Sequence, residues 1–303
     1  MMKRISLIIF LMSCVTFAAC NSSTEERASE ATETYPNAGL LVSADELSSM
    51  LANEDILLID ARSDTGEAYI PGAIHFAAIP ELGDTTNPIP NYLIGPEAFQ
   101  VKMRNIGLNQ DDNVVILDGG NSLQAARLFY ALEYYGFSNA SILNGGMAAW
   151  QENEYPTEVE SKTVSETGNF TVEIQPSRFC DYETIVAASN DPDKVVFDVR
   201  SKGEYTGEVQ RAEKSGHIPN AVNLEWSAVL ETGEIPYFKS ASEIQEMYSE
   251  AGLTPEKEII PHCQTNNRGA HAYFTLRLMG YDSVRPYEAS WAEYGNREES
   301  VVE

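Results

Sequence analysis

Cys263 is the residue whose type and surroundings best suit covalent chemistry. It follows a short apolar run, 259–262, and precedes a segment with helical character, so it lies where a strand ends and a helix begins. Backbone N–H groups at a helix N-terminus lack intrahelical acceptors and carry partial positive charge. Arg268 adds a full positive charge. Such a loop favours the thiolate, which is the nucleophilic form of cysteine, and its N–H groups could also bind an oxyanion.

The other cysteine and histidine side chains suggest less. An inert buried thiol is the commoner fate of a single cysteine and is the alternative for Cys263. Cys180 lies outside any such loop, so we expect it to be structural; a Cys180–Cys263 disulfide in an oxidising compartment would block the site. His75 and His271 lack partners at metal-ligand spacing, and no Cys/His cluster suggests zinc. We therefore expect no metal and no organic cofactor.

The elements that must position Cys263 occur twice along the chain. In each half an apolar, β-rich run ends in Asp-x-Arg, and a second apolar run is followed by a tight loop and an amphipathic helix that ends at glycine. This repeat predicts duplication of one α/β domain, with a central, mostly parallel sheet flanked by helices in each copy. The matched segments are 56–62 and 195–200, 114–122 and 259–268, and the helix ends at Gly136 and Gly280.

The composition excludes several classes of protein. Of 303 residues, 43% are hydrophobic, including 15 Tyr and 11 Phe, which is enough for a folded core. Four cysteines are too few for a disulfide-stapled mini-protein. The net charge is −26, which argues against a nucleic-acid partner. An anionic substrate would need a local cationic site that overcomes this negative field.

The N-terminus has the pattern of a secretory signal. Lys3 and Arg4 precede an apolar run, 5–17, that is too short for a comfortable membrane span. Ala18-Ala19-Cys20 resembles the lipobox of bacterial lipoproteins, although Phe17 stands where that pattern prefers Leu. We expect lipidation of Cys20 and a cell-envelope protein outside the cytoplasm, periplasmic or at the surface, held to the membrane by its N-terminal lipid only. An ordinary cleaved signal is the alternative.

These patterns divide the chain into five parts. The polar, acidic stretch after Cys20 has no apolar periodicity and predicts a flexible tether. A second acidic stretch with Pro156 predicts a linker between the domains. The expected parts are a signal peptide at 1–19, a tether at 20–38, a first domain at 39–152, a linker at 153–169 and a second domain at 170–297.

At these residues the chain resembles the tandem rhodanese-type sulfurtransferases that act on thiosulfate or 3-mercaptopyruvate. The run 284–294 is similar to the family's C-terminal signature, with Ala289 in place of Gly. The run 216–221 is similar to its GHIPGA motif, with Asn220 in place of Gly, and the inserted stretch 206–215 resembles the two-domain members. The resemblance implies two rhodanese-like α/β domains.

The same resemblance implies which domain is active and how. Asp118 stands at the loop position of Cys263, so the first domain is expected to be catalytically silent. In a two-step, ping-pong reaction the Cys263 thiolate would attack the sulfane sulfur of a small anionic donor such as thiosulfate and become a persulfide. An acceptor such as cyanide or a thiol would then remove the outer sulfur.

The expected substrate-binding residues surround the nucleophile. An Arg near Arg211 helps to bind the donor anion in two-domain relatives, whereas the alternative here is a solvated surface charge. The expected binding residues are Gln264, Thr265, Asn266, Asn267, Arg268 and Arg211. Asp198 and Arg200 are expected to form an ion pair that orders the site, His217 to fix its turn, and His262 to pack under the loop.

The donor is less well defined. The loop Gln-Thr-Asn-Asn-Arg is neither the strongly basic loop associated with thiosulfate nor the loop of mercaptopyruvate enzymes. The segment 76–95 has Asp84 but lacks the His that mercaptopyruvate enzymes place there. Thiosulfate is therefore favoured, with 3-mercaptopyruvate as the alternative donor.

Three other functions remain as alternatives. His262-Cys263 and Arg268 also resemble protein tyrosine phosphatases, but those have five residues between Cys and Arg, whereas four stand here. A Cys-dependent phosphatase is thus a minor alternative. The others are a non-catalytic envelope lipoprotein that binds an anion or a partner, and a carrier that passes persulfide sulfur to a dedicated protein.

Overall fold

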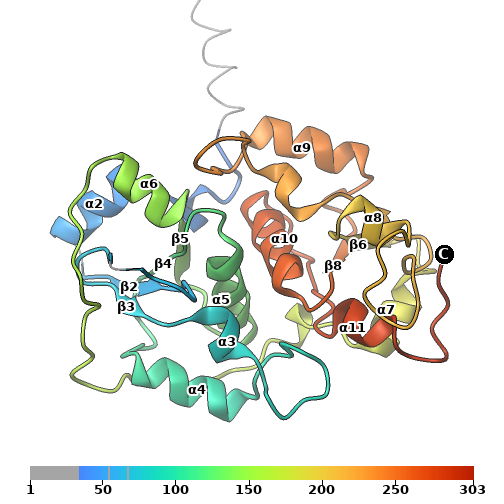
Figure 1. The fold of residues 1–303 in the computed structure, drawn as a ribbon, viewed down its shortest axis with the longest axis horizontal. Helices are drawn as coiled ribbons and strands as arrows, with labels where there is room; N and C mark the ends of the chain where they lie inside the picture. Colours follow the sequence, from blue (N-terminus) through green and yellow to red (C-terminus); the bar gives the residue numbers. More distant parts are fainter. Residues whose placement is uncertain (1–33, 54, 67) are drawn as a thin grey trace, which may run out of the picture.

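The structure is a computed structural model that describes residues 34–53, 55–66 and 68–303 (Figure 1). The expected signal peptide, Cys20 and most of the expected tether lie outside these residues. Among the described residues, no helix combines the length and the apolar content that a membrane span requires.

The first domain is built on a parallel sheet of five strands in the order β1-β5-β4-β2-β3. Its central strand β4, with the sequence Val-Val-Ile-Leu, is buried at every position, as expected of a strand covered on both faces. The strands are β1 (Leu41–Val42), β2 (Leu57–Asp60), β3 (Ile74–His75), β4 (Val114–Leu117) and β5 (Ala140–Leu143).

Helices cover both faces of this sheet (Figure 1). Leu47 of α2 and Trp150 of α6 belong to the core on one face, whereas Leu82 of α3 and Phe99 of α4 belong to the core on the other, which also includes α5. The helices are α2 (Ala44–Asn53), α3 (Ala78–Leu82), α4 (Pro96–Asn105), α5 (Leu123–Tyr134) and α6 (Gly146–Glu152), with the short 3-10 helix η1 (Ala38–Leu40) before them.

The second domain repeats this plan with a sheet of three strands. Its parallel sheet has the order β7-β6-β8, with β6 (Lys194–Asp198), β7 (Val222–Asn223) and β8 (Glu258–His262). Parallel bridges Ile259↔Val284 and Cys180↔Tyr287 stand where β5 and β1 stand in the first domain. The prediction of two α/β domains with parallel sheets flanked by helices is confirmed.

The helices of the second domain follow in the same order. Gly280 ends the helix α10 at a φ of 80°, as Gly136 ends α5 at 91°, so both occupy the left-handed position expected of helix C-caps. The helices are α7 (Tyr182–Ala188), α8 (Lys202–Tyr205), α9 (Ala241–Glu250), α10 (Asn267–Leu278) and α11 (Ser290–Tyr294), with the 3-10 helices η2 (Pro176–Arg178) and η3 (Trp226–Val229).

The segment between the domains runs over the first domain. Between Tyr155 and Asn169 it contains no helix or strand. Its backbone bonds to that domain at Tyr69–Glu158, where two N–H···O contacts of 2.8 Å form, and at Lys162, whose N–H donates to Ala73. The buried Phe170 then joins the first domain's core.

The start of the described chain also contacts the second domain. Asn37 donates from its backbone N–H to Leu278 O at 3.0 Å and from its side chain to Arg277 O at 2.6 Å, and the Tyr35 hydroxyl donates to Lys239 O. Residues within the range expected for the tether are therefore bound to the C-terminal end of α10.

The two domains meet mainly along α5 and α10, the helices that follow the two matched loops (Figure 1). At one end of this interface the guanidinium of Arg127, on α5, makes bonds of 2.7 and 3.1 Å with the carboxylate of Glu288 in the second domain. Both side chains are almost fully buried, at 1% and 0% exposed. The backbone of Leu93 donates to the same carboxylate, and Asn91 O accepts from Arg127.

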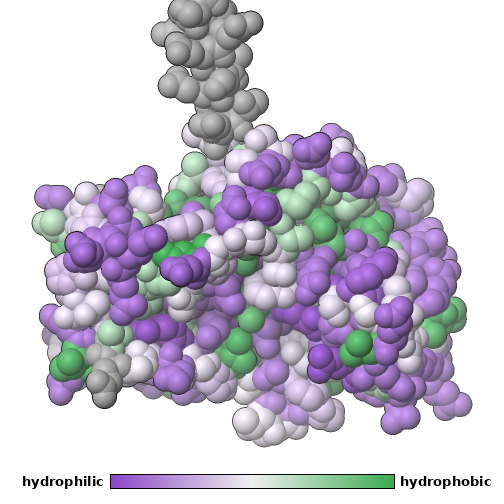
Figure 2. All heavy atoms as spheres, turned by 45° about the horizontal axis from the view of Figure 1, so that its top comes forward, coloured by the Kyte–Doolittle hydropathy of each residue, from purple (hydrophilic) through white to green (hydrophobic). Residues whose placement is uncertain are grey.

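The face of the molecule drawn in Figure 2 is mostly hydrophilic, with hydrophobic residues in smaller groups between the hydrophilic ones. Among the described residues the exposed large hydrophobic side chains lie on different segments: Val101, Val159, Ile174, Val186, Val209 and Val301. Single exposed hydrophobic residues are normal on a soluble domain and do not mark a docking surface.

The interdomain ion pair yields a stability prediction. Arg127→Met leaves the Glu288 carboxylate buried without its cation, so we expect the free energy of unfolding to fall by about 3–5 kcal/mol. Lys102→Met, which breaks the exposed Lys102–Glu81 pair, is the matched control and should cost less than about 1 kcal/mol. Urea unfolding measures both, and equal effects of the two changes would contradict a stabilising role for the buried pair.

Candidate active site

Cys263 lies directly after β8, at the carboxyl end of the sheet, and α10 begins four residues later. Asn266 makes the turn between them with a left-handed backbone, φ 56° and ψ 9°, which Asn tolerates better than most residues. Cys263 is a free cysteine and is 1% exposed. The expected strand–loop–helix setting of the thiol is thus present.

The peptide groups of this loop are oriented by α11. The N–H groups of Trp291 and Ala292 donate to the carbonyls of Cys263 and Gln264 at 3.0 and 2.9 Å. Because these two carbonyls are turned toward α11, the N–H groups of the same trans peptide units, those of Gln264 and Thr265, face the other way. In this fully described part of the chain four of these N–H groups have no protein acceptor, those of Gln264, Thr265, Asn267 and Arg268.

Two further residues fix the loop: Glu288, which precedes α11, and Ser290, which is its first residue. The Ser290 hydroxyl accepts from the N–H groups of Cys263 and Asn266 at 3.3 and 3.2 Å and donates to Tyr287 O. The Asn266 side chain donates to the Glu288 carboxylate at 2.6 Å. The carboxylate that binds Arg127 of the first domain therefore also holds the turn beside the nucleophile.

A second set of residues, at the carboxyl ends of β6 and β8, packs next to the loop. Asp198 and Arg200 form the expected ion pair, at 2.5 Å, and the Arg200 guanidinium lies 4.2 Å from the centre of the Trp291 ring. His262 is fully buried next to Asp198, and burial lowers its pKa to about 4, so the ring is neutral at pH 7. His217 stacks on Tyr205 and bonds to its carbonyl, which places it at the turn.

The cations of the site are paired rather than free. Both terminal nitrogens of Arg268 bond to the Glu204 carboxylate, at 2.8 and 3.0 Å. Burial alone would raise the pKa of Glu204, but hydrogen bonds from Arg268 lower it to about 2. Burial alone would likewise lower the pKa of Arg268, yet Glu204 and the nearby Cys263 sulfur raise it above its usual value. Arg268 is therefore beside the thiol, but its charge is shared with a carboxylate.

The residues predicted from the sequence come together around Cys263. Arg211 lies 3.5 Å from Glu204, with 58% of its side chain exposed, and its carbonyl accepts from the Gln264 amide. Cys180 is a free, buried thiol in a different core cluster, so no Cys180–Cys263 disulfide forms. Burial raises the pKa of Cys180, which suits an unreactive thiol.

The matched loop of the first domain already holds an acidic side chain. Asp118 occupies the position of Cys263, and its carboxylate accepts from four backbone N–H groups at 2.9–3.4 Å, those of Gly120, Ser122, Gln124 and Ala125. Ser122 has the left-handed backbone of Asn266, with φ 59° against 56°. Burial raises the pKa of Asp118, whereas these backbone hydrogen bonds act to lower it. The first domain thus shows this loop directing its N–H groups at oxygen acceptors.

Sequence reasoning missed three residues of the site: Glu204, Glu288 and Ser290. Ser201-x-x-Glu204 has the pattern of a helix capping box, which α8 forms, and this pattern could have marked Glu204 as a fixed carboxylate. Glu288 and Ser290 belong to the run 284–294, but their contacts are with distant residues. Among the described residues no group of three or more His, Cys, Asp or Glu is placed to hold a metal ion.

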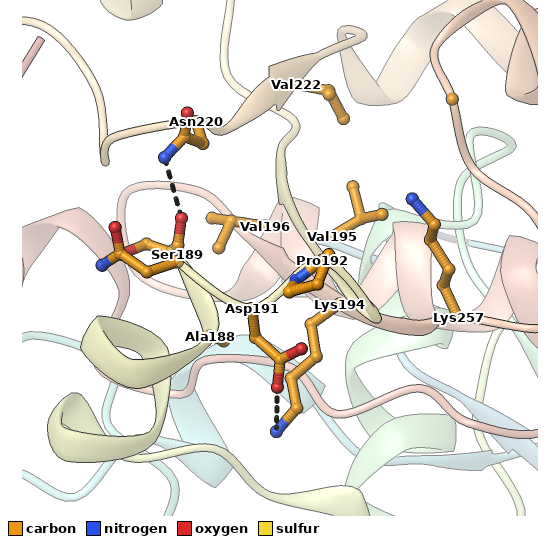
Figure 3. A pocket seen from close by; sticks show the side chains of 12 residues that line it. Ala188, Ser189, Asp191, Pro192, Lys194, Val195, Val196, Asn220, Val222 and Lys257 are labelled. Carbon is orange, nitrogen blue, oxygen red and sulfur yellow. Dashed lines mark hydrogen bonds and ion pairs between the residues drawn. The ribbon is translucent and has the colours of Figure 1, made fainter.

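The second domain also has a cavity far from Cys263. It measures about 500 Å³ and is lined by residues at the amino ends of β6 and β8, including Lys194 and Lys257, and by Asn220 (Figure 3). Lys194 is paired with Asp191 and Glu258. Because Cys263 follows the opposite, carboxyl end of β8, this cavity is separate from the candidate active site.

Comparisons with known proteins agree with this geometry. A family model described as a rhodanese-like domain matches residues 43–153 and 182–297. The chain is 30% identical over 277 residues to 3-mercaptopyruvate sulfurtransferase of Escherichia coli K12, covering 86% of this chain and 97% of the relative. It is also 30% identical over 286 residues to thiosulfate sulfurtransferase of Corynebacterium glutamicum, covering 89% and 92%.

Solved structures show the same fold. The crystal structure of the E. coli 3-mercaptopyruvate enzyme SseA superposes with a TM-score of 0.74 at 29% identity, covering 84% of this chain and 99% of that one. The anaerobic ergothioneine biosynthesis enzyme of Chlorobium limicola superposes with a TM-score of 0.78 at 22% identity, covering 89% of this chain and 71% of that one.

Ser290 offers a test of how the loop is held. It has a left-handed backbone, φ 52°, and the matching residue of the first domain is Gly146, also at 52°. Ser290→Gly should therefore keep the fold while the Cys263 and Asn266 amides lose their acceptor. We expect amide hydrogen exchange in the segment 263–268 to become about tenfold faster. Asn220→Gly, at a φ of 60° away from the loop, is the control; unchanged protection in Ser290→Gly would contradict the assignment.

Proposed function

The chain belongs to the rhodanese family, and on this premise we propose that it is a sulfurtransferase that moves a sulfane sulfur through a persulfide on Cys263. The relatives named above are sulfurtransferases that act on thiosulfate or 3-mercaptopyruvate. The proposal joins that activity to Cys263, which of the two thiols in the described residues is the one that stands at a loop with free N–H donors.

One observation carries the proposal: the two matched loops hold a hydrogen-bonded carboxyl group and a thiol at corresponding positions. The Asp118 carboxylate of the first domain is bound by four backbone N–H groups. In the second domain the N–H groups of Gln264, Thr265, Asn267 and Arg268 have no protein acceptor, and Cys263 takes the sequence position of Asp118. A persulfide anion on Cys263 would extend into this set of donors, which would stabilise its negative charge.

The reaction needs no redox partner. The Cys263 thiolate attacks the outer sulfur of thiosulfate, the S–S bond of the donor breaks, and its electron pair leaves with sulfite. Cyanide or a thiolate then attacks the outer sulfur of the persulfide, and the Cys263 thiolate is regenerated. The acceptor is released as thiocyanate or as a new persulfide.

Thiosulfate is the donor we propose in preference to 3-mercaptopyruvate. The loop of this chain differs from the mercaptopyruvate loop, and the segment 76–95 lacks a histidine. A carrier that passes sulfur to a dedicated protein would also load Cys263 but would not discharge to cyanide. A binding module would not load at all, so one assay separates the three functions.

Cys263→Ser is the central test of the activity. Because a hydroxyl cannot form a persulfide, thiocyanate production from thiosulfate and cyanide should fall by about 100-fold or more. Cys180→Ser, at the other buried free thiol, should retain most activity. Intact mass after thiosulfate treatment should show one added sulfur atom in the wild type and none in Cys263→Ser. Thiocyanate production by Cys263→Ser at the wild-type rate would refute the mechanism.

We also propose that the protein is anchored outside the cytoplasm by a lipid on Cys20. The basic start, the short apolar run and the small residues before Cys20 support this. Cells grown with an alkyne-tagged fatty acid should yield a labelled, membrane-bound protein, and Cys20→Ala should abolish both the label and the membrane fraction. Labelling that persists in Cys20→Ala, or an unlabelled soluble wild type, would contradict the anchor.

A further inference from the structure

Glu204 holds both of the cations that stand near Cys263. It lies on α8, where it forms a capping box with Ser201, and its side chain is 3% exposed. Its carboxylate binds the two terminal nitrogens of Arg268 at 2.8 and 3.0 Å, and Arg211 Nε lies 3.5 Å from it. The capping bonds fix the carboxylate, so it cannot turn away when a ligand arrives.

The charges around the loop therefore nearly cancel. Arg268 and Arg211 supply two positive charges, against one negative charge on Glu204 and one on the Cys263 thiolate. The remaining buried charges beside the loop are paired with each other, Asp198 with Arg200 and Glu288 with Arg127. The chain as a whole carries −26. The side-chain charges thus add little net attraction for a donor with two negative charges, and the surrounding field repels it.

We propose that Glu204 makes the Cys263 site selective for sulfane-sulfur donors with a single negative charge, of the thiosulfonate class R–SO₂–S⁻, over the thiosulfate dianion. The inference rests on the sulfurtransferase function proposed above. The two donors present the same outer sulfur and the same sulfonyl centre, and they differ by one oxyanion charge.

The loading step balances for the thiosulfonate as it does for thiosulfate. The Cys263 thiolate attacks the outer sulfur, the sulfur–sulfur bond breaks, and the electron pair leaves with the sulfinate R–SO₂⁻. One negative charge enters and one leaves. The persulfide anion that remains is the same in both cases.

The test compares kcat/KM for methanethiosulfonate and thiosulfate, with saturating cyanide as the acceptor. The wild type should favour methanethiosulfonate. Glu204→Gln retains the capping shape, since Gln also serves in a capping box, but removes the charge. We expect this variant to raise the thiosulfate-to-methanethiosulfonate ratio of kcat/KM about tenfold.

Two further variants keep the test decisive. Glu243→Gln makes the same change in the exposed capping box of α9, formed with Ser240, and should leave the ratio unchanged. Arg211→Gln should lower the thiosulfate-to-methanethiosulfonate ratio of kcat/KM. Because the Arg211 side chain is more than half exposed, this variant should fold even if Glu204→Gln does not. A purely structural Glu204 would reduce both donors equally in Glu204→Gln.

The outcomes distinguish a failure of the charge selectivity from a failure of the proposed sulfurtransferase function. If Cys263 is loaded but the donor ratio stays within twofold in both Glu204→Gln and Arg211→Gln, the charge selectivity is wrong and the sulfurtransferase function stands. If neither donor loads Cys263 in the wild type, both are overturned. Opposite shifts of the ratio in the two variants would support the proposed role of Glu204.

Discussion

The buried carboxylate of Glu288 is the contact on which the active loop and the domain pair both depend. It receives Arg127 and the backbone of Leu93 from the first domain and the side chain of Asn266 from the loop beside Cys263. Such a charge is costly to bury unless every partner is present. The first domain and the turn beside Cys263 therefore share one buried carboxylate, so the first domain contributes to the shape of the site.

The two matched loops show how the second domain differs from the first. The first domain fills its ring of N–H donors with its own carboxylate, Asp118, and so cannot bind another anion there. The second domain replaces that carboxylate with Cys263, shortens the loop by one residue before its helix, and introduces the Ser290 hydroxyl where the first domain has Gly146. Ser290 keeps the left-handed backbone of the glycine, and the hydroxyl holds two loop amides.

The site shows how a protein with a net charge of −26 could attract an anionic substrate. Attraction in the loop comes mainly from fixed backbone N–H groups, which act only over short distances. The two arginines at the loop are partly neutralised by Glu204, so they order the site as well as attract a ligand. The proposed preference for a thiosulfonate over thiosulfate rests on this balance, because the second negative charge of thiosulfate would be poorly compensated.

The sequence by itself determined the duplicated α/β fold, the order of strand, loop and helix around Cys263, and the contrast between Asp118 and Cys263. These features are local: apolar runs make the strands, Gly136 and Gly280 end the helices, and the residue after the central strand takes the loop position. Only the tertiary structure decided that Arg268 is paired with Glu204 and that Arg127 reaches Glu288. Those partners are 64 and 161 residues apart in the chain. The pairing of a guanidinium with a distant carboxylate depends on how the elements and the domains pack, and no local sequence pattern predicts it.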